Sequence, residues 1–157
     1  MMKKNAQLLI SILICQLAGF IGAIFTMPAI PTWYNTLAMP SFSPPSWLFA
    51  PVWITLYTMM GISFFLVWIK KSPSGVKQTA ITIFFIQLLL NALWSPSFFG
   101  LRSPIAGLIV IILLWITIVL TIAAFHKISK NSARILIPYF LWVSFALVLN
   151  FSIWWLN

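Results

Sequence analysis

Five long apolar segments follow one another along this chain, and they constrain its fold more than any other feature. A helix rising about 1.5 Å per residue needs about 20 mostly apolar residues to cross a hydrocarbon core of about 30 Å. The segments of that length are residues 7–27, 46–69, 78–99, 104–125 and 133–156. Only 6% of the 157 residues are charged, too few to cover a soluble fold of this size. The sequence predicts an all-α membrane protein, a single domain over residues 1–157 built as a five-transmembrane-helix bundle.

The basic residues predict how the bundle sits in its membrane. With five spans, one side of the chain carries Lys3, Lys4, Lys70, Lys71, Lys77, Lys127, Lys130 and Arg134. The other side carries Arg102 alone. By the positive-inside rule the N-terminus is cytoplasmic and the C-terminus lies outside, in a multi-pass protein of the cell membrane. Because these cations end apolar runs and form no polar stripe, the expected partner is the lipid bilayer and not nucleic acid.

The chain contains no Asp and no Glu, which removes whole classes of function. Glycosidases, aspartic proteases and Ser-His-Asp hydrolases all need a carboxylate, and so does a typical magnesium site. Cys15 stands alone in an apolar run, so one chain cannot build a disulfide or a thiolate cluster. We therefore expect no metal site, no required cofactor and no firm catalytic residue, and we interpret Cys15 as a small buried side chain.

The loop over residues 28–45 differs from the other connections. It contains five prolines together with Trp33, Tyr34 and Phe42, and it carries no charge. One interpretation is a lid that folds over the end of the bundle, where proline reduces the entropy lost on ordering. The other is a loop lying flat among the lipid headgroups, anchored by Trp33 and Tyr34.

Helical spacing places several aromatic and amide side chains on common faces. These faces are Trp53, Tyr57 and Gly61 in the second segment, Gln87, Asn91 and Ser95 in the third with Trp94 one step round, and Trp142, Ala146 and Asn150 in the fifth. Buried amides are costly in lipid without partners, so the faces should point toward one another. They predict an apolar, aromatic-lined pocket under the loop. The alternative is that the amides only bond across helix pairs and the tryptophans only pack.

The first segment carries small residues at a spacing typical of close helix contacts. Ala18 and Gly22 form one pair, and Gly19 and Ala23 form a second. This small-xxx-small pattern predicts close packing against a neighbouring helix or a second subunit.

A set of motifs from Trp33 to the C-terminus carries a family resemblance. The motifs are Trp33-Tyr34, Pro40-Ser41-Phe42, Pro44-Pro45, Pro51-Val52-Trp53, Leu56-Tyr57, Gly61, Gln87, Leu90-Asn91, Trp94-Ser95, Phe98-Phe99-Gly100, Arg102, Pro138-Tyr139, Trp142, Phe145-Ala146 and Leu149-Asn150. Together they resemble the TspO/MBR family of tryptophan-rich sensory proteins, which is related to the mitochondrial translocator protein or peripheral benzodiazepine receptor. Met39 departs from it, since the family commonly has Lys there. The tail over residues 154–157 lacks the basic cholesterol-recognition segment of animal members.

The resemblance implies a binding cavity under the first loop, frequent homodimers, and porphyrin, haem or benzodiazepine-type ligands. Its ligand contacts carry over to Tyr34, Trp53, Asn91, Trp94, Trp142 and Ala146. With the faces above, the expected ligand-binding residues are Tyr34, Trp53, Tyr57, Gln87, Asn91, Trp94, Trp142, Ala146 and Asn150, with Arg102 as a contact for a propionate. Light-dependent porphyrin breakdown, attributed to some members, implicates Trp53 and Trp142.

The expected function is a membrane receptor or sensor that binds tetrapyrroles in an aromatic cavity. The alternatives are a light-dependent porphyrin-degrading enzyme and a tetrapyrrole transporter. His126 is the only histidine, and it lies at the opposite, cytoplasmic end of the predicted bundle. Any haem is therefore expected to be held by stacking and shape, without a histidine axial ligand.

Overall fold

The computed structural model describes residues 3–157, which are helical or irregular and include no strand in that range. The helices are α1 (Lys4–Ala29), α2 (Phe49–Ile69), α3 (Ser74–Ser95), α4 (Pro104–His126), α5 (Lys130–Ile135) and α6 (Ile137–Leu156). Shorter helical turns are η1 (Tyr34–Thr36), η2 (Ser46–Leu48) and the π-helical η3 (Pro96–Gly100). Because η2 runs into α2, η3 extends α3 and α5 leads into α6, the described chain forms five helices long and apolar enough to cross a membrane. The predicted five-helix bundle is confirmed.

Helix ends follow local hydrogen bonding as well as hydropathy. α1 extends past the predicted 7–27 at both ends and includes Pro28, whose carbonyl accepts a hydrogen bond from the Thr32 hydroxyl at 2.8 Å. α4 begins with Pro104 behind Ser103, whose Oγ accepts a hydrogen bond from the backbone N–H of Ala106 and so caps the helix. The predicted fifth segment is broken near Leu136, because Pro138 has no N–H to continue the helix.

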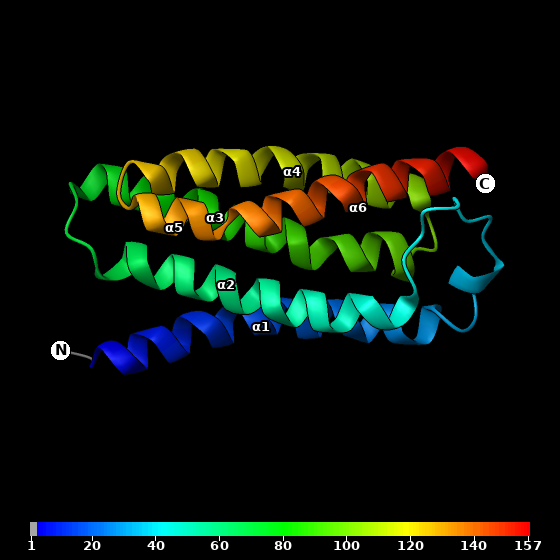
Figure 1. The fold of residues 1–157 in the computed structure, drawn as a ribbon, viewed down its shortest axis with the longest axis horizontal. Helices are drawn as coiled ribbons and strands as arrows, with labels where there is room; N and C mark the ends of the chain where they lie inside the picture. Colours follow the sequence, from blue (N-terminus) through cyan, green and yellow to red (C-terminus); the bar gives the residue numbers. More distant parts are fainter. Residues whose placement is uncertain (1–2) are drawn as a thin grey trace.

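The helices lie side by side, with the N-terminus at one end of the bundle and the C-terminus at the other (Figure 1). α1 packs against α2 and α3, and α4 packs against α3 and α6. α5 joins α2 and α4 at the N-terminal end. By contrast, α2 makes few contacts with α3 or α6, which leaves room between these helices toward the C-terminal end.

The N-terminal half of the bundle has a solid core. Phe84 stacks between Phe64 and Phe125, with ring centroids 4.8 and 5.5 Å apart. Ser63 and Ser132 exchange hydrogen bonds, each hydroxyl donating to the other residue's carbonyl at 2.9 and 2.7 Å. This half is therefore filled by side chains that hold α2, α3, α4 and α5 together.

The segment over residues 30–48, here called the lid, covers the other end of the bundle. Trp33 packs edge-on against Phe98, with ring centroids 5.5 Å apart, and Phe42 packs against Phe145, with ring centroids 6.3 Å apart. The Asn157 side chain pairs with the backbone of Ala38, accepting from its N–H at 2.9 Å and donating to its carbonyl at 3.1 Å. This packing favours the lid interpretation over a loop lying flat among headgroups.

Candidate ligand-binding cavity

A cavity of about 600 Å³ lies under the lid, between α1, α2, α3 and α6. Small-molecule sites usually measure about 300–1,000 Å³. Its wall includes Tyr34, Trp53, Tyr57, Asn91, Trp94, Trp142, Ala146 and Asn150, which are all the predicted contact residues except Gln87 and Arg102. The faces inferred from helical spacing therefore meet in one place, and the tryptophans at this depth do more than pack against lipid.

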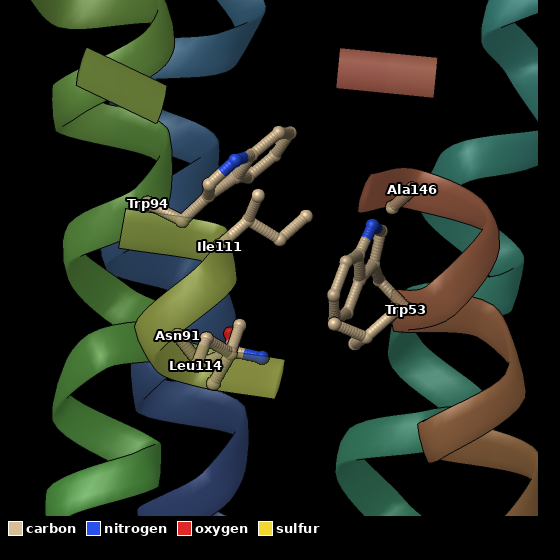
Figure 2. A pocket seen from close by; sticks show the side chains of 7 residues that line it. Trp53, Asn91, Trp94, Ile111, Leu114 and Ala146 are labelled. Atoms are coloured by element: carbon tan, nitrogen blue, oxygen red, sulfur yellow. The ribbon is translucent and has the colours of Figure 1, made fainter. Parts of the chain in front are cut away.

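A narrow recess on the α4 side adjoins this cavity. Figure 2 shows Trp94 and Ile111 facing Trp53 and Ala146 across a gap, with Asn91 and Leu114 beside them. Ile111 and Leu114 belong to α4, a helix that contributes no residue to the predicted site. No signal in the sequence could have found them, because α4 is aliphatic on several faces and these two positions carry no polar or aromatic mark.

The walls of the cavity are aromatic pairs. Trp53 stacks on Tyr57 with ring centroids 5.4 Å apart and planes 29° apart, and Trp94 stacks on Phe98 at 5.5 Å and 23°. Trp142 packs edge-on against Phe49 at 6.2 Å. Phe49 lines the cavity but was not predicted, although it lies one helical turn before Trp53 and could have been found by that spacing. Flat, rigid surfaces of this kind suit a flat, conjugated ligand.

A chain of buried hydrogen bonds closes the cavity toward the N-terminal half. The Tyr57 hydroxyl donates to Asn91 Oδ1 at 2.5 Å, and Asn91 Nδ2 donates to the Tyr139 hydroxyl at 2.7 Å. The Tyr139 hydroxyl in turn donates to Gln87 Oε1 at 2.9 Å. Gln87 therefore lies behind the cavity wall, where it supports the floor through Tyr139. We call these four residues the floor network.

Of the tryptophans deep in the apolar segments, two donate an indole N–H hydrogen bond to another side chain and one has no hydrogen-bond partner within the described residues. Trp94 Nε1 donates to Asn150 Oδ1 at 3.2 Å, while Asn150 Nδ2 donates to the Pro104 carbonyl at 2.8 Å. Trp115, also deep in its segment, lies outside the cavity wall and donates to Ser144 Oγ at 2.8 Å. Trp142 Nε1 is buried and has no hydrogen-bond partner within residues 3–157. That N–H is covered by neighbouring atoms, so it would reach an acceptor in the cavity only if the indole turned.

The cavity wall is almost uncharged. Tyr34 lies in η1 and faces Phe99 at 5.5 Å, and burial raises the pKa of Tyr34 to about 12, so its phenol is a neutral donor at physiological pH. Arg102 does not line the cavity. It is exposed in the turn before α4, where its φ of 50° is the left-handed conformation common after a helix end.

The residues that most often bind metals lie away from the cavity. His126 is the last residue of α4, at the end of the bundle opposite the lid. Cys15 of α1 is fully buried in the hydrophobic core. Over the described chain, residues 3–157, no three His, Cys, Asp or Glu side chains come together. What the arrangement offers a ligand is stacking surface and a phenol.

The small residues of α1 serve contacts inside the chain. A Cβ added at Gly19 would clash with the ring of Tyr57 on α2, and one at Gly22 would lie 3.1 Å from Ser95 Oγ on α3. The predicted close packing is therefore against neighbouring helices at the edge of the cavity. These two glycines give no support to a second subunit on α1.

Sequence comparisons identify the family of this chain. The profile of the TspO/MBR family matches residues 11–156. The tryptophan-rich protein TspO of Chlorobaculum tepidum is 46% identical over 157 residues, covering 100% of this chain and 99% of that protein. Protein CrtK of Rhodobacter capsulatus is 38% identical, covering 91% of this chain and 88% of CrtK. The translocator protein of Homo sapiens is 36% identical, covering 88% and 83% of the two chains. The chain therefore belongs to the TspO/MBR family.

Proposed function

We propose that this membrane protein is a receptor or sensor that binds porphyrin or haem-type tetrapyrroles in the cavity under the lid. The observation that carries the proposal is the combination of three cavity-lining tryptophans, Trp53, Trp94 and Trp142, with a buried Trp142 N–H that has no partner within the described residues. Stacking on an indole favours a flat aromatic ring system. A buried donor without a partner costs free energy, which an acceptor on the ligand would recover once the Trp142 indole turned toward it. A relative from Cereibacter sphaeroides carries the name tryptophan-rich sensory protein.

The carboxylates of a tetrapyrrole would lie toward the lid end, where water and headgroups can solvate them. Arg102 is the one cation in the connections at that end, and a propionate contact with it stays a prediction, since Arg102 does not line the cavity. The macrocycle itself would lie lower, above the floor network. The side chains of the cavity wall are mostly apolar, which suits a ligand with one polar edge.

Quenching of tryptophan fluorescence by protoporphyrin in detergent tests the proposal. We expect saturable quenching in the wild type. Trp142→Phe and Asn91→Ala should weaken binding by about fivefold each, the loss expected for one hydrogen bond or a disturbed floor. The control is Trp155→Phe, because Trp155 is 73% exposed and lies outside the cavity. Linear quenching that is identical in all four proteins would mean only partitioning into the micelle, and the proposal would fail.

Light-dependent porphyrin breakdown is the second candidate function. It is favoured by the position of Trp53 and Trp142, which line the same cavity and could both reach one ring system. The test is illumination of the complex with Trp53→Phe and Trp142→Phe variants. A photochemical enzyme should lose product formation in these variants while it keeps most of its binding. Binding without light-dependent loss of the porphyrin in the wild type would leave the receptor role alone.

A transport role has less support. It needs a path to both ends of the bundle, and the cavity wall extends no deeper than Gln16, Tyr57 and Asn91. Beyond them lies the core around Phe84. Uptake of porphyrin into vesicles containing the protein would support transport, and equal uptake into empty vesicles would count against it.

The orientation and assembly of the protein complete the proposal. The cytoplasmic N-terminus and the homodimer stay predictions, the first from the basic residues and the second from the family resemblance. In a cell membrane with this orientation, the lid and the cavity would face the outside. The receptor would then meet tetrapyrroles that reach the outer leaflet.

A further inference from the structure

The cavity wall includes side chains that also lie on the outer surface of the bundle. Phe20 and Met27 of α1 are 66% and 71% exposed, and Ile54 of α2 is 59% exposed, yet all three line the cavity. An enclosed site between four helices would be lined by buried residues. The cavity therefore reaches the surface of the protein between α1 and α2, on a face where apolar side chains meet lipid.

The seam between α1 and α2 is tightly closed in its N-terminal half. A Cβ on Gly61 would lie 2.5 Å from Ile12 Cα, so the two backbones are in direct contact at that level. One helical turn closer to the lid, Gln16 Nε2 donates hydrogen bonds to the Ile54 carbonyl and to Thr58 Oγ1, each at 3.0 Å. Gln16 is the last hydrogen-bonded bridge from α1 to α2 in the described chain.

Above Gln16 the seam is lined by small side chains. Gly19 and Ala23 of α1 and Ala50 of α2 all line the cavity. Gly19 still packs against the Tyr57 ring of α2, so the gap begins at Phe20, and from Phe20 to Met27 the helix rises about 10 Å toward its lid end. The gap therefore extends from the hydrocarbon to the level of the headgroups.

The lid is the other way into the cavity, and it is fastened at several points. Asn157 holds the Ala38 backbone by two hydrogen bonds, at 2.9 and 3.1 Å. Trp33 and Phe42 pack against aromatic rings of η3 and α6. Entry through the lid would break these contacts, whereas entry between α1 and α2 would require only that apolar side chains such as Phe20 and Ile54 move aside.

We infer that the gap between α1 and α2 above Gln16 is a lateral portal, through which a flat amphiphile dissolved in the bilayer enters the cavity without opening the lid. The identity of that amphiphile as a tetrapyrrole rests on the proposed function. A molecule with an apolar body and carboxylates on one edge partitions into a membrane with the edge among the headgroups. It could slide through the portal while its carboxylates stay at that level. The portal therefore selects ligands that partition into lipid over ligands dissolved in water.

Binding kinetics in lipid nanodiscs test the portal with protoporphyrin as the probe. Ala50→Phe narrows the gap, and it should slow both association and dissociation by about tenfold, a larger effect than it has on the equilibrium Kd. The matched control is Ala123→Phe on the lipid-facing side of α4, which should change neither rate. Asn157→Ala, which releases the lid, should also leave both rates unchanged. The portal is refuted if Asn157→Ala speeds association while Ala50→Phe has no effect.

A second measurement needs no porphyrin, so the portal and the proposed function can fail separately. Ala146→Cys in a Cys15→Ala background places one thiol in the cavity wall. An uncharged maleimide dissolved in the lipid should label it faster than a charged maleimide in the water, and adding Ala50→Phe should slow only the first reaction. If protoporphyrin does not bind but this dependence holds, the ligand is wrong and the portal stands. If Ala50→Phe leaves the labelling by the lipid-dissolved reagent unchanged, the portal is wrong whatever the ligand.

Discussion

Tyr34 shows how one residue of the lid can be both part of the site and a reporter of it. Burial raises the pKa of Tyr34 from its usual 10.0 to about 12, because the folded lid disfavours the charged phenolate. The folded state therefore prefers the neutral phenol, and the stability that this gives is lost as the pH rises above 10.0 toward 12. Between pH 6 and 9 the phenol keeps its proton in both states, so it adds no pH dependence.

This predicts a late ionisation step at Tyr34. The difference in ultraviolet absorbance between the wild type and Tyr34→Phe should show one phenol titrating near pH 12. A step near pH 10 would mean that water reaches the ring and that the lid does not bury it. The control is the same titration in denaturant, where the phenol should return to about 10.

Gln87 illustrates a residue that sequence reasoning placed one layer too close to the ligand. Its spacing with Asn91 correctly puts both on one face of α3, but the face continues past the cavity into the floor network. The spacing of two residues shows which face of a helix they share, but it does not show whether a residue lies at the level of the cavity or below it. That level is set by where the neighbouring helices pack against one another. Here they close at Tyr139, which is 1% exposed.

The floor network predicts a coupled loss of stability. Gln87→Leu leaves the buried Tyr139 hydroxyl without its acceptor, and it should lower the free energy of unfolding by about 1–3 kcal/mol. Tyr139→Phe removes the donor as well, so Gln87→Leu should cost less in that background. Thermal unfolding in detergent of the two single variants and the double variant measures this coupling. Strictly additive losses would show that the hydrogen bond contributes nothing to the floor.

At the scale of helices, the contact between α1 and α2 is the feature that closes the site from below. A Cβ at Gly61 would meet the Ile12 backbone, which cannot move aside as a flexible side chain could. Gly61→Ala should therefore destabilise the fold by about 1–3 kcal/mol, the usual cost of overpacking. It should also weaken ligand binding, since Gln16 could no longer bridge the helices at 3.0 Å.

The control for this prediction is the same change at an open position. Gly75 lies in the first turn of α3, and a Cβ there meets nothing within 4 Å. Gly75→Ala should leave stability unchanged or raise it by about 0.4–1 kcal/mol, because alanine restricts the unfolded chain. Equal melting temperatures for Gly61→Ala and Gly75→Ala would contradict the close backbone contact.

The elements themselves were predictable to the extent that hydropathy defines them. A run of about 20 apolar residues is stable only as a helix that crosses a membrane, so the number of membrane helices follows from the sequence. Their local irregularities do not. The break at Leu136 and the π-helical turn of η3 are changes in local backbone hydrogen bonding, which do not alter the hydropathy of a segment. Prolines 96 and 138 mark both places, but a proline also fits the first turn of an unbroken helix.

For the whole molecule, the distribution of charge predicts one orientation in the membrane. The positively charged residues near the α2–α3 connection, Lys70, Lys71 and Lys77, lie at the opposite end from the lid. In a Cys15→Ala background, Ser41→Cys in the lid should react with an impermeant maleimide added to intact cells. Ser72→Cys between α2 and α3 should react only after the membrane is opened. The reverse pattern would place the cavity in the cytoplasm and would overturn the positive-inside assignment.

The candidate site was predictable where chemistry is unusual for a membrane helix and unpredictable where it is ordinary. Tryptophan and asparagine deep in apolar segments stand out, and all of them except Trp115 line one cavity. The aliphatic part of the wall, such as Ile111, has the composition of any lipid-facing surface. Only the packing of α4 against α3 and α6 decides that this side chain points inward. Arg102 was predictable as an isolated cation, but it does not line the cavity wall.

The positions of His126 and Tyr34 in the whole molecule determine whether a protein side chain could coordinate the iron of a bound haem. His126 ends α4 on the side away from the lid, 12 residues and about 18 Å along the helix from Leu114, which lines the recess beside the cavity. The phenol of Tyr34, with its pKa of about 12, stays protonated and is a poor iron ligand. Ferric haem and metal-free protoporphyrin should therefore bind with Kd values within about threefold of each other, since one shared hydrophobic and stacking contribution holds both. His126→Ala should leave the Soret band of bound haem unchanged. A shifted band, or haem binding more than tenfold tighter than protoporphyrin, would mean that a protein side chain reaches the iron and that the cavity closes further around its ligand.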